Sequence, residues 1–135
     1  MERMNDFLYS LYLGDRWCEC MEIKEDRVVI QINCISRLKK GTKEWNYYSD
    51  EDVEHGCLVF EGVTEFKTNR DLEFNDEIYE VKVLEKQDDV YTFVVYGSNV
   101  SLDSMGRLVC VNLEYQIKAK KLYILNPLDN TIITE

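Results

Sequence analysis

The sequence predicts one mainly β domain, α+β at the margin. We expect seven to eight mostly antiparallel strands in a rolled sheet, an open barrel or a sandwich, with one short N-terminal amphipathic helix. Two observations predict this fold class. Apolar residues alternate with a period of two over most of the chain after residue 16. Short polar turns separate these stretches, and the only proline, Pro127, interrupts none of them. The length of 135 residues suits a single domain spanning residues 1–135.

The first element is predicted to be a helix. Its apolar stripe, spaced by three and four residues, consists of Met4, Phe7, Leu8, Leu11 and Tyr12. Gly14 is expected to end the helix, because glycine readily adopts the left-handed conformation of a helix C-terminus. We expect the stripe to pack on the sheet.

The alternating stretches predict the strands. They span residues 17–23, 27–35, 57–67, 78–85, 90–96, 100–102, 108–117 and 121–125. Turns are predicted at Glu25–Asp26, at residues 87–89 and at residues 103–106, and Gly62 is a candidate bulge. Residues 49–56 are predicted to form one short helical turn, because Ser49 can cap it and Gly56 can end it.

The N-terminus does not resemble a secretory signal. Glu2, Arg3, Asn5 and Asp6 interrupt its apolar residues, and nowhere does the chain have an apolar run of the roughly 20 residues that span a bilayer. We therefore expect a cytoplasmic protein that does not enter membranes.

Five cysteines, an odd number, favour reduced thiols over a disulfide framework. Cys34 and Cys110 lie in alternating apolar stretches and are predicted to be buried. Cys18 and Cys20 form a C-x-C pair that would project from one face of a strand. His55 is the only histidine, so ligands at the spacing of a metal site are lacking. We predict neither a metal nor a cofactor.

The charge is concentrated in the middle of the chain. The whole protein carries a formal charge of −10, which opposes binding to nucleic acid or anionic lipid. Residues 44–89 contain fifteen acids and four bases, a net of −11, whereas the remainder has a net of +1. Self-repulsion on this scale destabilises a compact state, so we expect a functional reason for the excess of acids in residues 44–89.

A basic protein partner would supply that reason, because an acidic surface steers a cationic one into contact. Large aromatic residues, which dominate binding hot spots, lie directly beside the acids. The predicted partner-binding residues are Trp45, Tyr47, Tyr48, Asp50, Glu51, Asp52 and Glu54. The alternative interpretation is an ordinary strand at residues 45–48 with solvated acids next to it.

Two other function classes stay open. Tyr79, Tyr91, Tyr96 and Tyr115 on the predicted strands could line a small-molecule pocket, although tyrosines on strands more often belong to the core. A hydrolase built on unmarked carboxylates is the third alternative, but no acid pair stands out. A Cys57–His55 dyad has only proximity in sequence behind it. The chain contains no phosphate-binding glycine motif. A non-enzymatic binding protein is therefore the leading prediction.

Three local patterns carry a resemblance. They are Leu11 to Arg16 after the short amphipathic helix, Trp45-Asn46-Tyr47-Tyr48, and Gly56 to Glu61. Together they resemble small acidic uncharacterised bacterial proteins that are associated with polymorphic toxin systems, some of which are immunity proteins. The resemblance implies a non-enzymatic protein that neutralises a toxin by masking its active site. It assigns no functional residue.

Overall fold

The computed structural model of the chain describes residues 2–13, 16–37, 52–68 and 76–134. These residues form one short helix and twelve strands, so the predicted mainly β class is confirmed. The elements are α1 (Glu2–Tyr9), β1 (Leu11–Tyr12), β2 (Cys18–Lys24), β3 (Arg27–Ile32), β4 (Cys34–Arg37), β5 (Val53–Glu54), β6 (Cys57–Glu61), β7 (Glu65–Thr68), β8 (Glu77–Gln87), β9 (Val90–Leu102), β10 (Leu108–Ala119), β11 (Lys121–Leu125) and β12 (Ile132–Ile133).

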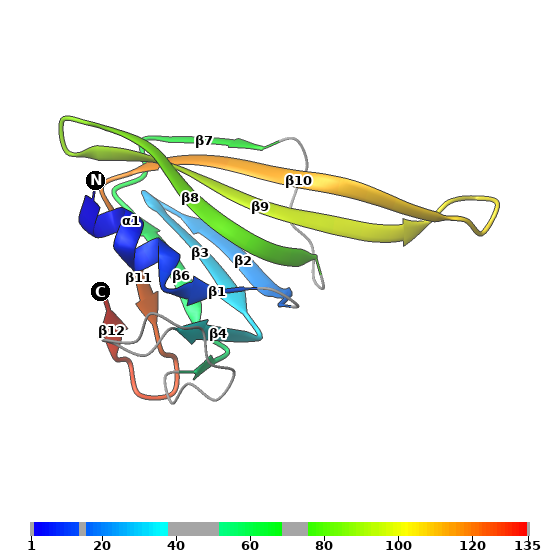
Figure 1. The fold of residues 1–135 in the computed structure, drawn as a ribbon, viewed down its shortest axis with the longest axis horizontal. Coiled ribbons are helices and arrows are strands. Elements are labelled where there is room, and N and C mark those ends of the chain that lie inside the picture. Colours follow the sequence, from blue (N-terminus) through cyan, green and yellow to red (C-terminus); the bar gives the residue numbers. More distant parts are fainter. Residues whose placement is uncertain (1, 14–15, 38–51, 69–75, 135) are drawn as a thin grey trace.

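The strands form three antiparallel sheets. A five-stranded sheet has the order β12-β11-β6-β3-β2, and a four-stranded sheet has the order β7-β10-β9-β8. A small three-stranded sheet has the order β1-β4-β5. The two larger sheets lie one over the other, and α1 lies beside them against β8 (Figure 1).

The chain passes between the two large sheets twice, from β6 to β7 and from β10 to β11. β6 and β11 pair in the five-stranded sheet, and their neighbours along the chain, β7 and β10, pair in the four-stranded sheet. The chain turns at Gly62, where φ is +70°, and at Lys120, whose N–H donates to the Glu61 carbonyl at 3.0 Å. A bridge between Trp17 and Glu77 joins the sheets again near the start of β2 and β8. The described strands are thus rolled around a common core.

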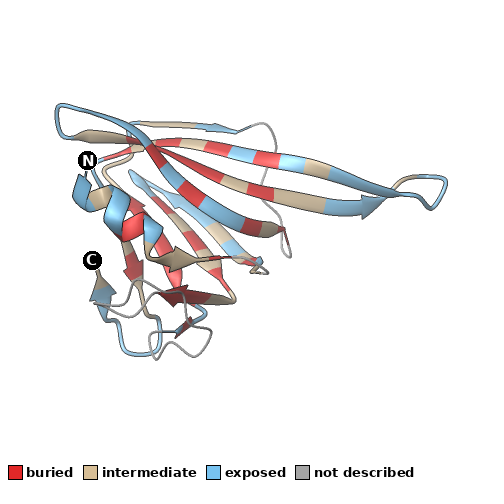
Figure 2. Ribbon diagram, in the orientation of Figure 1, coloured by how far each residue is buried: buried red, intermediate tan, exposed pale blue. Residues whose placement is uncertain are grey.

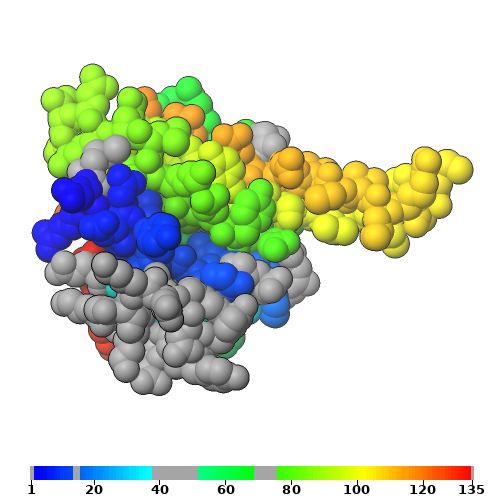
Figure 3. Space-filling view, in the orientation of Figure 1, coloured from blue at the N-terminus to red at the C-terminus, as the bar shows by residue number. Residues whose placement is uncertain are grey.

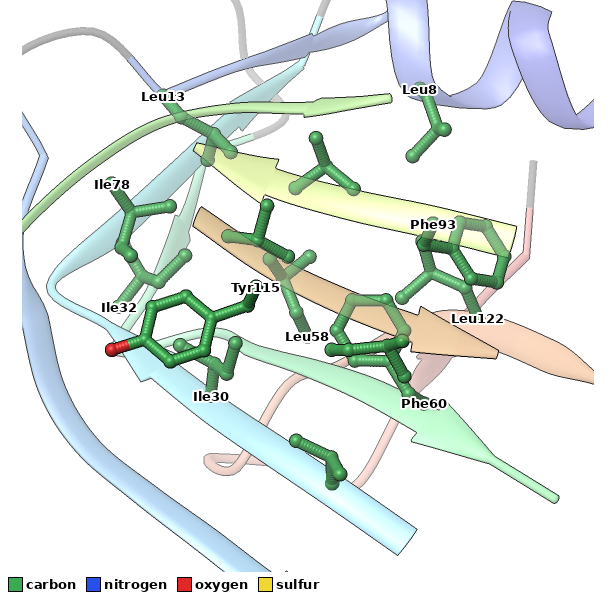
Figure 4. Close-up of a cluster of buried hydrophobic side chains, with 14 of the residues drawn as sticks. Leu8, Leu13, Ile30, Ile32, Leu58, Phe60, Ile78, Phe93, Tyr115 and Leu122 are labelled. Carbon is green, nitrogen blue, oxygen red and sulfur yellow. The ribbon is translucent and has the colours of Figure 1, made fainter. Parts of the chain in front are cut away.

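The core lies between the two larger sheets. Phe60 of β6 and Phe93 of β9 meet edge to face there, with ring centroids 5.4 Å apart. Both side chains are fully buried, as are Ile30, Leu58 and Tyr115 around them (Figure 4). Buried residues alternate with more exposed ones along the part of β10 from Leu113 to Ala119, because successive side chains of a strand point to opposite faces, whereas residues 92–95 of β9 are all buried (Figure 2).

The helix is shorter than predicted. It ends at Tyr9, and Leu11–Tyr12 forms β1, which pairs with Ser36 and Arg37 of β4. The backbone of residues 11 and 12 therefore takes ladder hydrogen bonds from β4 in place of a further helical turn. Phe7 and Leu8 of the predicted stripe are buried, as expected for a helix that packs on the sheet.

Several predicted strand boundaries were wrong. The stretch 27–35 is divided at Asn33 into β3 and β4, and 57–67 is divided at Gly62 into β6 and β7. In both cases the two halves join different sheets. Conversely, 90–96 and 100–102 belong to one strand, β9, because β10 pairs with it continuously from Leu102 to Tyr91. The predicted turns at Glu25–Asp26 and at residues 103–106 are confirmed, and so is the hairpin across residues 87–89, with Gln87 as the last residue of β8.

The single helix of the described residues, α1, is too short to span a bilayer.

Candidate functional site

The residues predicted to bind a partner divide into two groups. Asp52 and Glu54 lie in the described part of the chain, and both are exposed. The other predicted residues lie outside the described residues. They are Trp45, Tyr47, Tyr48, Asp50 and Glu51.

The helical turn predicted at residues 49–56 is wrong for its described part. Val53–Glu54 forms β5, which pairs with Ile35 and Cys34 of β4. The N–H of Gly56 donates to the Val53 carbonyl at 3.3 Å, which closes a turn into β6, and His55 adopts a φ of +56° in that turn. Val53 is buried, so pairing with β4 and packing in the core outweigh the helix-start pattern of the acids.

His55 is held by a carboxylate from a distant strand. Its Nδ1 lies 2.6 Å from Oε1 of Glu19, which belongs to β2. This hydrogen bond raises the pKa of the imidazole above its ordinary value, and the negative charges of Glu19 and Glu54 raise it further. When the imidazole is protonated, the pair is a charge-assisted hydrogen bond.

Two further acids, Asp52 and Glu54, precede His55 in the same segment of the chain. We call Glu19, Asp52 and Glu54 the acidic cluster. Glu19 and Glu54 both act electrostatically on His55, and Asp52 and Glu54 both act on the Cys34 thiol, whose pKa is raised chiefly by burial and also by these two charges. Sequence analysis missed Glu19, because 36 residues separate it from His55 and only the fold brings them together.

The other described acids of the middle segment do not continue this cluster as one face. They lie on β6, on β7, and on β8 with the residues directly before and after it, and these strands belong to different sheets or to opposite edges of one sheet. Several face basic residues. The ion pairs are Glu61 with Arg27, Glu65 with Lys67 and Lys118, Glu80 with Lys82, and Asp89 with Lys120. The charge excess along the sequence is thus distributed over several surfaces.

The cysteine predictions are partly wrong. Cys110 is exposed and Cys34 is only partly buried, although both were predicted to be buried. Cys18 is buried whereas Cys20 is exposed, because the β2–β3 register shifts between them and they do not share a face. All five described cysteines are free.

Thiol chemistry gains no support from these positions. Burial raises the pKa of Cys18 to about 12 and also raises the pKa of Cys57, which disfavours the thiolate that a nucleophile requires. The Sγ of Cys57 lies 3.9 Å from the carbonyl oxygen of His55, while the imidazole contacts Glu19. These contacts do not form a Cys–His dyad.

The tyrosines predicted to line a pocket are mostly placed elsewhere. Tyr115 is fully buried in the core, Tyr91 lies 5.6 Å from Phe93 between ring centroids, and Tyr96 lies under the Lys82 ammonium. Tyr79 alone of the four lines the open groove of about 660 Å³ between α1, β1 and β8. Tyr9 and Tyr12 line the same groove. Sequence analysis placed Tyr12 in the apolar stripe of the predicted helix and did not single out Tyr9.

Three carboxylates of the described residues have pKa values below their ordinary values. Lys67 and Lys118 lower that of Glu65, and turn hydrogen bonds lower those of Asp103 and Asp129. A carboxylic acid that donates a proton in catalysis needs the opposite shift, so these three give a hydrolase no support.

Within the described residues, no three His, Cys, Asp or Glu side chains come together as metal ligands.

Comparison with known proteins yields one match. No curated protein and no solved structure matches the chain. A family model described as a family of unknown function (DUF6258) matches residues 1–134. Because that match covers nearly the whole chain, the protein belongs to this family.

Proposed function

We propose that this protein is a non-enzymatic acidic protein-binding module of immunity or inhibitor type. It acts in the bacterial cytoplasm, where it masks a basic partner such as a toxin. Its binding surface comprises the acidic cluster together with Trp45, Tyr47, Tyr48, Asp50 and Glu51, the neighbouring residues that the sequence singles out.

The gathering of Glu19, Asp52 and Glu54 is the observation that supports this function best. Their charges add, because each of the three raises the pKa of a neighbouring imidazole or thiol. A local negative potential of this kind attracts a cationic surface and raises its association rate. In the sequence, Asp52 and Glu54 directly follow residues 45–51, which contain the large aromatic residues that are typical of binding hot spots.

Charge neutralisation tests the proposal. The variant D50N/E51Q/D52N/E54Q is compared with wild type in pull-downs from the source organism's lysate, followed by affinity measurements with the purified partner. We expect wild type to retain a basic protein at low salt and to lose it at about 1 M salt, where the Debye length is about 3 Å. The variant should lose it at both salt concentrations.

A matched control removes the same number of charges elsewhere. The variant E80Q/E85Q/D88N/D89N changes four exposed acids of β8 and its turn, and Asn tolerates the positive φ of residue 88. It should bind the partner nearly as well as wild type. A partner that binds both quadruple variants equally would contradict the proposed surface.

The groove favours a second candidate, a domain that binds a small molecule. Its volume of about 660 Å³ falls in the range of ligand pockets, and Tyr9, Tyr12 and Tyr79 offer aromatic faces with polar tips. A ligand that binds only the native state raises the melting temperature. In a thermal-shift screen, a true groove ligand would stabilise wild type and L84A but not Y79A, since Leu84 does not line the groove.

A further inference from the structure

The β9–β10 hairpin extends beyond the strands that flank it. β8 pairs with β9 no further than Ser98, and β7 pairs with β10 only from Tyr115 to Lys118, whereas β9 and β10 pair on to Leu102 and Leu108. We call residues 100–110 the arm. It projects from the body of the molecule (Figures 1 and 3).

One face of the arm is apolar and exposed. Val100 pairs with Cys110 and Leu102 pairs with Leu108, so these four side chains form two adjacent cross-strand pairs on the same face. Val100, Leu102 and Leu108 are 61%, 67% and 77% exposed, and Cys110 is also exposed. We call these four residues the arm patch. Met105, 76% exposed, extends the apolar surface to the tip.

The arm is neutral on a strongly acidic protein. Its only charged residues, Asp103 and Arg107, form an ion pair with each other at 3.2 Å, whereas the protein carries −10. The arm therefore offers no net charge that would attract a basic or an acidic partner. Its apolar patch is of the kind that marks an interaction site.

We propose that the arm patch is a self-association surface, on which two copies of this chain pack their arms face to face about a two-fold axis. A two-fold contact is isologous, so it needs a patch that complements itself, and a neutral apolar patch does so without repulsion. With the two arms antiparallel, the acidic bodies lie at opposite ends of the paired arms. Because charges farther apart than about 8 Å are screened at physiological salt, this arrangement limits their repulsion.

Self-association through the arm is independent of the acidic cluster and responds to salt in the opposite sense. Added salt screens the repulsion between two acidic bodies, so it should strengthen the dimer. The same salt should weaken the binding of a basic partner. The two proposals can therefore fail separately.

Sedimentation equilibrium tests the proposal over a range of protein and salt concentrations. We expect wild type to form a concentration-dependent dimer that strengthens with salt. L102S/L108S should raise the dimer dissociation constant by about tenfold or more, because both leucines lose apolar contact in both copies. The matched control I23S/L84S alters two exposed apolar residues of the body, each more than half exposed, and should leave the dimer intact.

Cross-linking provides a second measurement that needs no change in the leucines. A short bismaleimide should link two copies of C20S through Cys110 and should link far fewer copies of C110S. A wild type that stays monomeric without Cys110 cross-links would overturn the proposal, as would a dimer that survives L102S/L108S. Monomers that instead bind phosphatidylcholine vesicles through the arm would overturn it in favour of a membrane surface.

Discussion

Oε1 of Glu19 on β2 lies 2.6 Å from Nδ1 of His55, the only histidine of the chain, in the turn between β5 and β6. The turn gives His55 a φ of +56°, and a hydrogen bond from its N–H to the Asn33 carbonyl at 2.9 Å fixes the backbone there. The fold thus holds an exposed imidazole against a partly buried carboxylate. The pKa of His55 can therefore be used to measure the negative charge of Glu19 and Glu54 in the acidic cluster.

The first prediction concerns the titration of His55. NMR of the single imidazole should give a pKa above the ordinary value of about 6.5. E19Q should lower this pKa strongly and E54Q more weakly, while E22Q on the same strand should leave it nearly unchanged. A pKa that does not respond to E19Q would show that the hydrogen bond is absent in solution.

The same pair predicts how the stability depends on pH. Because the pKa of His55 is raised in the folded protein, the pair contributes its full stability below the unfolded value of about 6.5 and loses it as the pH rises through the folded pKa. The stability difference between wild type and E19Q in urea unfolding should therefore shrink across that interval. A difference that stays constant from about pH 5 to about pH 9 would refute the linkage.

Phe60 and Phe93 are predicted to couple the two larger sheets. Their rings meet edge to face across the core, 5.4 Å apart, so each loses a specific partner when the other is changed. F60A should lower the free energy of unfolding by about 3–5 kcal/mol, whereas L84A should change it by less than about 0.5 kcal/mol.

A double-mutant cycle of F60L, F93L and the double variant should show a coupling free energy of about 0.5–1.5 kcal/mol between the two rings. Strict additivity would place the rings out of contact.

Gly97 is predicted to be intolerant of a side chain. A Cβ at this position of β9 would collide with the backbone carbonyl oxygen of Glu77, which cannot rotate away as a side chain would. G97A should therefore destabilise the protein by about 1–3 kcal/mol, as overpacking does. S101A, farther along the same strand and exposed, should be near neutral in the same unfolding experiment. Equal stabilities of the two variants would mean that β8 does not approach β9 so closely.

Asp103 is predicted to order the tip of the arm. Its carboxylate accepts the N–H of Met105 at 2.8 Å and the N–H of Arg107 at 2.9 Å, and these bonds lower its pKa. A lowered folded pKa means that the stabilisation is present above about pH 3.9 and is lost as the pH falls through the folded value. D103A should accelerate amide hydrogen exchange at residues 105 and 107, and S104A should not. Unchanged exchange in D103A would contradict this role.

Much of the fold could be predicted from local pattern. The alternation in β3 and β10 marks which side chains face the core, and the turn residues at 25–26 and 103–106 set two hairpins. Boundaries were less predictable. Asn33 and Gly62 end strands because the next residues join another sheet, and no local propensity encodes which sheet that is.

The candidate site was only partly predictable for the same reason. The exposure of Asp52 and Glu54 could be predicted from their charge. The contact between Glu19 and His55 could not, because it forms only when β2, β3 and β6 become neighbours in one sheet. The groove likewise combines α1 and β1 with β8, elements from distant parts of the sequence.

The sequence by itself determined the mainly β class, three of the hairpins and the near-neutral composition of the arm. It did not determine that the arm is exposed. Apolar residues recur at every second position in the arm, at Val100 and Leu102 and at Leu108 and Cys110, just as they do at Tyr115 and Ile117 farther along β10. Only the tertiary structure decides which face of the hairpin another sheet covers, because burial depends on what packs over a face and not on the strand's own pattern. Tyr115 and Ile117 face the core, whereas Leu108 and Cys110 lie on the opposite face of β10, which is exposed in the arm.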